Sequence, residues 1–177
     1  MEGALRLLAE QGYARMSLDG IAAAAGVSRP TLYRRWSSKA DLAMAALARR
    51  IDAESRPPAT SSTEKALVSV MRNLCRRLFR PNSMALVGTL LAEERQTPEL
   101  IELFRARVFR RRAAMLRQVL ERGRARGDVR ADADLGAVIH MMIGSIYAQY
   151  LSGEPRPKRW VERVVAATLG GIATRGR

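Results

Sequence analysis

Apolar residues return every three or four positions along almost the whole sequence, and this spacing limits the fold more than any other feature. It places the apolar side chains on one face of an α-helix, and the alternation that is typical of β-strands is missing. Short stretches rich in Pro, Gly or Ser interrupt the pattern, among them SRPPATSS at 55–62 and GEPRP at 153–157. The sequence therefore predicts an all-α protein of about nine helices.

The expected ends of the helices follow from capping residues. Side chains able to cap a helix precede six of the expected helices, namely Ser17, Ser28, Ser38, Ser61, Thr97 and Asp132. Two of them, Ser38 and Ser61, have an acidic residue three positions later, which is the spacing of a capping box. We expect helices at about residues 2–11, 18–25, 29–36, 39–54, 62–79, 83–95, 98 to 123 or 126, 135–153 and 158–175.

Composition excludes several classes of protein. The hydrophobic fraction of 47% is sufficient for a core, and no apolar run approaches the roughly 18 residues of a membrane span. The start, MEGALRLLAEQG, lacks the basic region of a signal peptide, so we expect a soluble, cytoplasmic protein with no membrane partner. The single cysteine, Cys75, is predicted to be a buried small hydrophobe. One histidine and scattered acidic residues form neither a nucleophile–base pair nor a metal cluster, so no enzyme activity, cofactor or metal is predicted.

Residues 17–36 have the pattern of a helix-turn-helix. Two helices separated by a three-residue turn that contains glycine are typical of this DNA-binding motif. Gly26 can adopt the positive φ that the turn requires, and Ala22 and Ala25 allow the two helices to cross closely. A small core under the turn is expected from Ile21, Val27, Leu32 and Trp36.

The outward side chains of this motif suit DNA. Arg29 and Thr31 lie in the first turn of the third expected helix, the part that meets base edges in the major groove. Arginine can bridge guanine O6 and N7, and the threonine methyl can pack on thymine. Tyr33, Arg35 and Lys39 offer a hydroxyl and positive charge to phosphates. The alternative is an ordinary solvated surface that carries two arginines. The glycine turn and the small core under it favour DNA binding over this alternative.

The stretch SLDGIAAAAGVSRPTLYRRWSSKADLAMAAL at 17–47 resembles the N-terminal DNA-binding domain of the TetR family of bacterial transcriptional regulators, and the match covers about residues 4–47. The resemblance implies a DNA-binding domain at 1–47, followed by an effector-binding and dimerisation domain at 48–177. Relatives usually begin with a basic arm and a longer first helix, whereas Met1 already lies at the expected helix, so arm contacts with DNA are left out of the prediction. The predicted DNA-binding residues are Ser17, Ser28, Arg29, Pro30, Thr31, Tyr33, Arg34, Arg35 and Lys39.

A single short recognition helix makes too few base contacts to find a site in a genome, so a homodimer on a palindromic operator is expected. Its half-sites would lie about 34 Å apart. The last two expected helices are apolar on more than one face and could form a four-helix interface, although an ordinary monomeric core is the alternative. The predicted interface residues are Ile139, Ile143, Ile146, Tyr150, Trp160, Val164, Leu169 and Ile172.

The remaining helices are expected to enclose a flexible, apolar pocket for an unknown small-molecule effector, or simply to fill a core. His140 could face the ligand or satisfy a buried hydrogen bond. The predicted pocket residues are Met71, Leu74, Phe79, Met84, Leu91, Phe104, Val108, Met115, His140, Met141 and Tyr147.

The net charge of +14 leaves a second function open. Ten of the 31 basic residues lie at 105–130, against two acidic ones. A solvated helix face would explain them, or a second surface for nucleic acid or an acidic partner. We therefore predict a sequence-specific regulator, a repressor by family habit, which a small hydrophobic ligand releases from its operator. The alternative is a nonspecific, basic, architectural DNA-binding protein.

Overall fold

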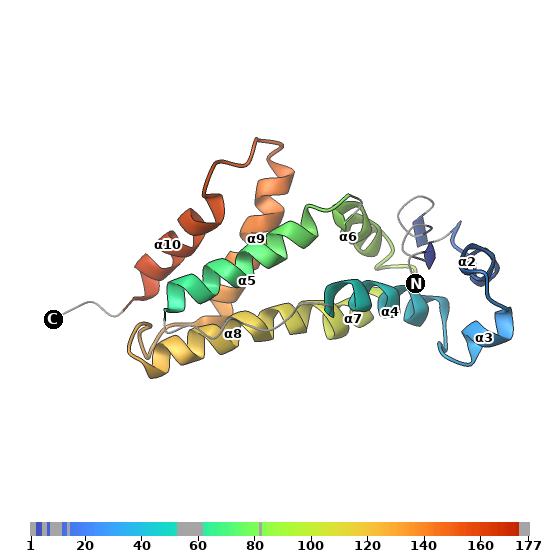
Figure 1. Ribbon diagram of the computed structural model, residues 1–177, viewed down its shortest axis with the longest axis horizontal. Coiled ribbons are helices and arrows are strands. Elements are labelled where there is room, and N and C mark those ends of the chain that lie inside the picture. Colours follow the sequence, from blue (N-terminus) through green and yellow to red (C-terminus); the bar gives the residue numbers. More distant parts are fainter. Residues whose placement is uncertain are drawn as a thin grey trace. The chain divides into compact units, whose positions relative to one another are not determined.

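The computed structural model describes residues 15–52, 62–81 and 83–173, together with residues 3, 4, 7, 12 and 13, and for 47–52 it describes the backbone alone. Every regular element in these ranges is helical (Figure 1). An isolated β-bridge joins Val129 to Ala173. The predicted all-α fold is confirmed. No helix in the described part of the chain is long and apolar enough to cross a membrane.

The helices fall into two compact units. The first unit is formed by Met1–Glu54 with Arg80–Arg111, and the second by Ser55–Phe79 with Arg112–Arg177. The helices of the first are α2 (Leu18–Ala25), α3 (Arg29–Tyr33), α4 (Lys39–Asp52), α6 (Ser83–Ala92), α7 (Pro98–Phe104) and the π-helical turn η1 (Arg105–Phe109). Those of the second are α5 (Thr63–Leu78), nearly all of α8 (Arg110–Ala125), α9 (Leu135–Leu151) and α10 (Trp160–Ile172).

The predicted division into domains 1–47 and 48–177 stays a prediction. In the structure, α6, α7 and η1 come after residue 48 in the sequence but share one compact unit with the DNA-binding helices. Helical backbone runs without a break from Pro98 to Ala125, as expected, with the unpredicted π-helical turn η1 inside it.

Four predicted caps differ in the structure. Ser28 and Thr97 are the N-cap residues of α3 and α7, but neither side chain makes a capping hydrogen bond. The side chain of Ser62 caps α5 by accepting the Lys65 N–H at 3.2 Å. Asp134 rather than Asp132 caps α9, because its Oδ1 accepts the Ala137 N–H at 3.0 Å. The helix itself begins at Leu135, as the apolar spacing predicts, and Asp134 is the residue directly before it.

Some expectations fall on residues outside the described ranges. They are most of the first expected helix at 2–11, the linker at 55–60, Ser61, and the end of the last helix at 174–175.

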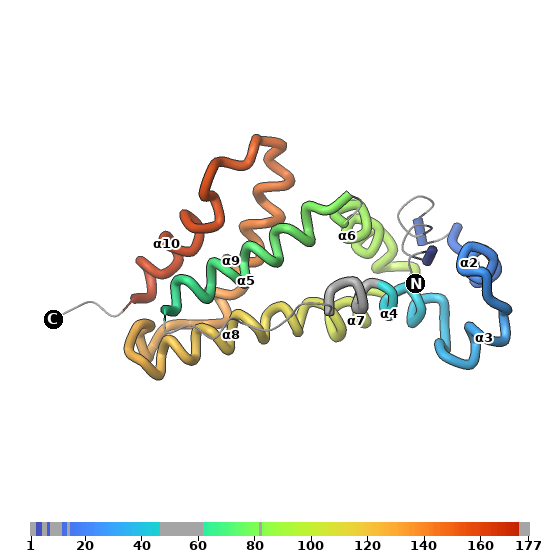
Figure 2. Tube along the Cα trace, in the orientation of Figure 1, coloured from blue at the N-terminus to red at the C-terminus, as the bar shows by residue number. Residues whose placement is uncertain are grey.

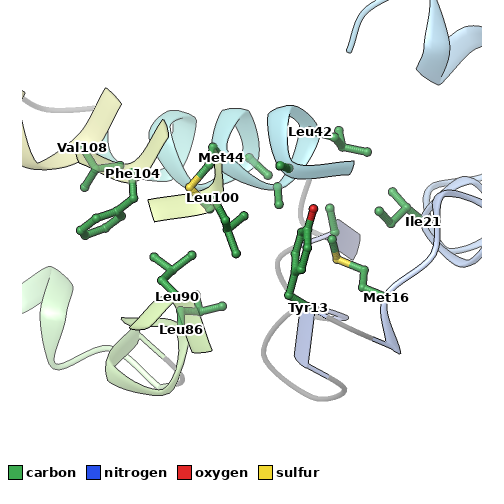
Figure 3. Close-up of a cluster of buried hydrophobic side chains, with 14 of the residues drawn as sticks. Tyr13, Met16, Ile21, Leu42, Met44, Leu86, Leu90, Leu100, Phe104 and Val108 are labelled. Carbon is green, nitrogen blue, oxygen red and sulfur yellow. The ribbon is translucent and has the colours of Figure 1, made fainter. Parts of the chain in front are cut away.

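The first unit has a continuous apolar core. Met16 and Ile21 pack with Leu42 of α4, and Met44 of the same helix joins Leu86, Leu90 and Leu100 from α6 and α7 (Figure 3). Because α4 contributes to both ends of this cluster, it ties the DNA-binding helices to α6 and α7.

In the second unit, α5 packs beside α9 and α10, and α9 and α10 are neighbours joined by the bend at 152–159 (Figure 2). The apolar face of α5 is buried at Leu67, Met71, Leu74 and Leu78. Burial of these apolar faces stabilises the second unit. The segment at 152–159 that connects α9 and α10 is rich in Pro and Arg.

Candidate nucleic-acid interface

The turn between α2 and α3 has the conformation that the sequence predicts. The Ser17 Oγ accepts the Gly20 N–H at 3.0 Å and caps α2. Gly26 ends α2 in the left-handed conformation, with φ 63° and ψ 32°, which is strained for residues with a Cβ. Both ends of α2 are therefore determined by single local residues.

The N-terminus of the short helix α3 differs from the prediction in how its cap residue bonds. Ser28 is the N-cap residue, but its side chain makes no capping hydrogen bond, and its Oγ lies 2.9 Å from the Oγ1 of Thr31 instead. Pro30 in the first turn has the φ that a helix start needs. The helix ends at Tyr33, earlier than the expected Trp36. Ser28 and Thr31 thus hold each other at the tip of the motif.

The core under the turn is smaller than expected. Ile21 and Leu32 are buried, and Trp36 packs partly buried against the same cluster, as predicted. Val27 is 39% exposed, so the expectation that it fills the space under the turn was wrong. It lies in the turn outside either helix, where the left-handed Gly26 directs the chain away from the core.

The outer face of α3 carries most of the predicted DNA-binding residues. Ser17, Ser28, Arg29, Pro30, Tyr33, Arg34 and Arg35 are exposed, and Thr31 is half-buried. Asp19 is the one acidic residue among positions 17–40, and in the structure it forms an ion pair with Arg29. This contact holds the Arg29 guanidinium at the start of α3, where it can meet a base edge. Sequence analysis did not identify Asp19 as part of the site.

Lys39 has a structural partner. Its Nζ donates to the Tyr13 carbonyl oxygen at 2.8 Å and lies 4.1 Å from the centroid of the Tyr13 ring. Burial of Tyr13, with a smaller contribution from Glu99 and Glu93, raises the pKa of its hydroxyl. The ammonium of Lys39 therefore joins the start of α4 to Tyr13, and a phosphate contact by this residue stays a prediction.

The first turn of α4 is joined to α7 and η1 by polar contacts. The predicted cap is present, because the Ser38 Oγ accepts the Asp41 N–H at 3.0 Å, and this hydroxyl also donates to Glu99 Oε1 at 3.0 Å. The Asp41 carboxylate accepts the N–H of Ser37, one residue before the position expected for a capping box. Its other oxygen lies 2.6 Å from Arg107 Nη1.

The environment of Asp41 favours its ionised form. Burial on its own would raise the pKa of this carboxyl, but the hydrogen bonds from Arg107 and Ser37 and the Arg107 charge together lower the pKa below its ordinary value. Sequence analysis missed both Glu99 and Arg107. No pattern within the sequence pairs Asp41 with a residue 66 positions away.

The predicted ligand-pocket residues lie in both compact units. Met84, Phe104 and Val108 are buried in the first unit, whereas Leu91 is 58% exposed there. In the second unit Met71 and Leu74 are buried. Phe79, Met115 and Tyr147 are half-buried, and Met141 and His140 are exposed, which does not fit the buried hydrogen bond considered for His140. A common pocket for these residues stays a prediction.

A cavity of about 370 Å³ lies in the second unit between α5 and the start of α10. Arg156 donates to the Cys75 Sγ at 3.1 Å and lies over the Phe79 ring at 4.7 Å. Cys75 is buried as predicted, and burial raises the pKa of its thiol. None of the predicted pocket residues lines this cavity. Its lining residues are Arg72, Cys75, Arg76, Arg156, Pro157, Arg159, Trp160, Val161 and Glu162.

The residues predicted for a dimer interface differ in how far they are buried. Tyr150 is exposed, and Trp160, Val164 and Leu169 are half-buried. The other four are covered by the chain's own core and present no surface to a second copy, namely Ile139, Ile143, Ile146 and Ile172. An interface on α9 must therefore use the opposite face of that helix.

The described residues hold no group of His, Cys, Asp and Glu side chains that could bind a metal ion. The chemistry of the site on α2 and α3 is that of a cationic surface with hydroxyl groups and one ion pair. Such a surface suits the phosphates and base edges of duplex DNA.

Comparison with known proteins identifies the family. A family model described as "Bacterial regulatory proteins, tetR family" matches residues 1–46, and one described as "Tetracyclin repressor-like, C-terminal domain" matches residues 57–168. The chain is 33% identical over 129 residues to an uncharacterised HTH-type transcriptional regulator, Rv1556, of Mycobacterium tuberculosis. This match covers 73% of the chain and spans 63% of the length of that relative.

Two further relatives cover the DNA-binding motif and the fold. A DNA-binding transcriptional repressor, TetR, of Mycobacteroides abscessus is 54% identical over 44 residues, which are 25% of this chain and 23% of that protein. The crystal structure of a TetR transcriptional regulator from Agrobacterium tumefaciens has the same fold, with a TM-score of 0.77 and 23% identity over 98% of this chain and 92% of that one. With family models matched across both its N-terminal and its C-terminal parts, the chain belongs to the TetR family of bacterial transcriptional regulators.

Proposed function

We propose that the protein is a sequence-specific transcriptional regulator that binds duplex DNA, represses transcription, and leaves its operator when a small ligand binds. The observation that carries the proposal is the exposed cationic face of α3, held on a turn that Gly26 makes in the left-handed conformation. The family to which the chain belongs consists of DNA-binding regulators and not of enzymes, which agrees with the absence of a catalytic constellation from the sequence.

The residues on α3 are assigned separate tasks on DNA. Arg29 and Thr31 in the first turn are positioned for base edges, since the start of a recognition helix enters the major groove. Tyr33 and Arg35 are exposed farther along and suit phosphates. The Ser17 hydroxyl accepts the Gly20 N–H and keeps its own proton for donation to a phosphate oxygen.

A selection of binding sites from random DNA duplexes tests the proposal. The wild-type protein is expected to enrich a palindromic sequence. Arg29→Ala is expected to relax the preference at particular bases and to cost about 1–3 kcal/mol of binding free energy. Arg35→Ala removes a phosphate contact, so it should weaken binding to all sequences equally and lower the salt dependence. Arg95→Ala changes an exposed arginine elsewhere in the first unit and is the control, with no effect expected.

The same selection distinguishes the proposed regulator from the alternative, a nonspecific architectural protein. A nonspecific architectural protein would enrich no sequence, and each lost arginine would reduce its affinity by a similar amount. Absence of any sequence preference in the wild-type protein would rule out the proposed regulator.

Repression is supported by the relative from Mycobacteroides abscessus, which is a repressor with a closely similar DNA-binding motif. Release by a ligand is proposed to act through α4. This helix contacts the DNA-binding part through Lys39 and Tyr13, and α7 and η1 through Ser38–Glu99 and Asp41–Arg107. A ligand that prefers another packing of α7 and η1 would therefore move the start of α4, and would weaken DNA binding by its difference in affinity for the two states.

A homodimer is proposed to form on one outward stripe of each of the last two helices. On α9 the exposed positions recur at helical spacing, and on α10 they do the same. Apart from His140 and Arg163 these side chains are apolar or small, so the stripes leave contiguous surface that a second copy can cover. The residues are Ala137, His140, Met141, Gly144, Ala148 and Leu151 on α9, and Arg163, Ala166, Ala167, Gly170 and Gly171 on α10.

A further inference from the structure

Arg112 differs from the other arginines of the basic stretch 105–130. Its residue surface is only 4% exposed, and neither Nε nor Nη1 has a hydrogen-bond partner among the described residues. The expectation of a solvated arginine face was therefore wrong for this position. Arg117, five residues later on the same helix, is half-exposed and lies 4.0 Å from Glu121, as that expectation requires.

Three helices of the second unit surround the Arg112 guanidinium. The guanidinium donates a hydrogen bond to the hydroxyl oxygen of Tyr147 of α9, and Arg77 of α5 lies close enough for its positive charge to act on it. Burial lowers the pKa of Arg112, and no carboxylate acts in the opposite direction. Each of the three helices also carries a buried apolar residue close in sequence to Arg77, Arg112 or Tyr147, namely Leu78, Leu116 and Ile146.

The acidic residues in the described part of the second unit have other partners or positions. Glu162 pairs with Arg72, Asp128 accepts from Thr63 at 2.6 Å, and Asp134 caps α9. Glu121 and Asp132 lie by exposed arginines, and Glu64 and Glu154 are exposed. The charge of Arg112 thus has no counter-ion in this part of the chain. Burial of an unpaired charge is strongly unfavourable, and buried polar groups are almost always satisfied.

We propose that Arg112, with the Tyr147 hydroxyl beside it, binds the carboxylate of a small organic ligand, so that the effector is a monoanion with an apolar body. This inference rests on the proposed ligand-responsive function and specifies the class of its ligand. A guanidinium binds a carboxylate through two parallel hydrogen bonds, and one unpaired cation is balanced by one negative charge. The buried apolar residues of the same three helices suit the body of such a molecule.

The proposal also gives a reason for a change of state. Nε and Nη1 are covered by the protein itself, so the guanidinium or its cover must shift before a carboxylate can reach them. A two-bond contact pairs Nη2 with either Nε or Nη1, so binding gives one of the two unsatisfied nitrogens a charge-assisted hydrogen bond, which is formed in one state and not in the other.

Matched pairs of ligands test the proposal on the full-length protein. The probes are octanoate with octanamide, 4-phenylbutyrate with its amide, and indole-3-acetate with its amide. Thermal unfolding and calorimetric titration are carried out without DNA, so that binding is measured apart from operator release. In at least one pair the carboxylate is expected to raise the Tm and to bind roughly tenfold or more tightly than the amide.

Variants assign this difference to Arg112. Arg112→Met is expected to abolish the advantage of the carboxylate and to raise the Tm of the ligand-free protein, because a buried unpaired charge is replaced by an apolar chain. Arg112→Lys keeps the charge but loses the two-bond geometry, and should bind more weakly than wild type. Tyr147→Phe should weaken carboxylate binding less than Arg112→Met. Arg117→Met makes the same change at an exposed position of α8 and should leave the difference within each pair unaltered.

Equal affinities within every pair, or a carboxylate advantage that persists in both Arg112→Met and Arg112→Lys, would overturn the assignment. Operator release, measured separately, distinguishes this failure from that of the proposed function. A carboxylate that binds through Arg112 but leaves DNA binding unchanged would refute only the proposed release of DNA by a ligand. A neutral ligand that releases DNA equally from wild type and Arg112→Met would refute only the proposed anion site.

Discussion

At the scale of single residues, arginines of the same chemistry have different roles because their surroundings differ. Arg29 is exposed and held by Asp19 at the start of α3, Arg107 is half-buried against Asp41, and Arg112 is buried with two unpartnered nitrogens. The sequence contains 28 arginines and 3 lysines, so residue type alone cannot separate these roles. The burial of each arginine and its nearest carboxylate distinguish these roles.

The Asp41–Arg107 pair leads to a prediction about pH. Because the folded protein lowers the pKa of Asp41, the pair adds stability at neutral pH, and this contribution is lost as pH falls through the lowered pKa, below about 4. Asp41→Asn is expected to reduce the free energy of unfolding by about 1 kcal/mol at pH 7, since Arg107 is 39% exposed and solvent screens the pair. The difference from wild type should vanish in acid.

Urea unfolding at several pH values, at one protein concentration, measures this effect. Glu94→Gln is the matched control, because Glu94 pairs with Arg105 at 2.9 Å where both side chains are about half exposed. It should change stability by less than about 0.5 kcal/mol. A loss in Asp41→Asn that is the same at pH 7 and pH 3 would contradict the assignment.

At the scale of elements, the helix α3 is too short to be stable alone, and its position depends on what precedes and follows it. Gly26 turns the chain before it, and the Ser38 cap begins α4 after it. The turn conformation is therefore as important for DNA reading as the side chains on α3.

Replacement of Gly26 tests the turn. A Cβ there would meet no atom within 4 Å, so the effect of Gly26→Ala comes from the left-handed backbone alone, about 1–2 kcal/mol of destabilisation. Gly88 in α6 is also exposed and open, but its φ is not positive, so Gly88→Ala should stabilise by roughly 0.5–1 kcal/mol. Chemical unfolding of both variants measures the two effects. A Gly26→Ala variant that is as stable as wild type or more stable would show that the turn does not need glycine.

At the scale of the whole molecule, the proposed dimer can be broken without harm to either unit. A Cβ at Gly144 in the outward stripe of α9 meets nothing within 4 Å, and arginine is a better helix former than glycine. Gly144→Arg should therefore yield a folded monomer of 19.6 kDa with weak operator binding, whereas the wild type is expected to be a dimer.

Light scattering after gel filtration measures the mass, and Gly88→Arg is the control. Gly88 has equally open surroundings on α6, a helix that carries neither stripe, so this variant should remain a dimer. If Gly144→Arg keeps the wild-type mass, the dimer uses another surface.

The sequence by itself determined what depends on residues a few positions apart. These features are the helical spacing, the caps at Ser17 and Ser38, and the left-handed turn at Gly26, together with the cationic face of α3 that follows them. The capping side chains were predicted less well, because Ser62 and Asp134 cap α5 and α9 in place of Ser61 and Asp132, and Ser28 and Thr97 make no capping hydrogen bond.

The tertiary structure alone decided which residues meet from distant parts of the chain. Ser38 and Glu99 are 61 positions apart, so no local pattern could pair them. The face of α9 that turns inward, which buries Ile143 and exposes Gly144, was also invisible in a helix that is apolar nearly all round. Arg112 is the extreme case, because only the packing of three helices separates a buried cation from the solvated arginines beside it.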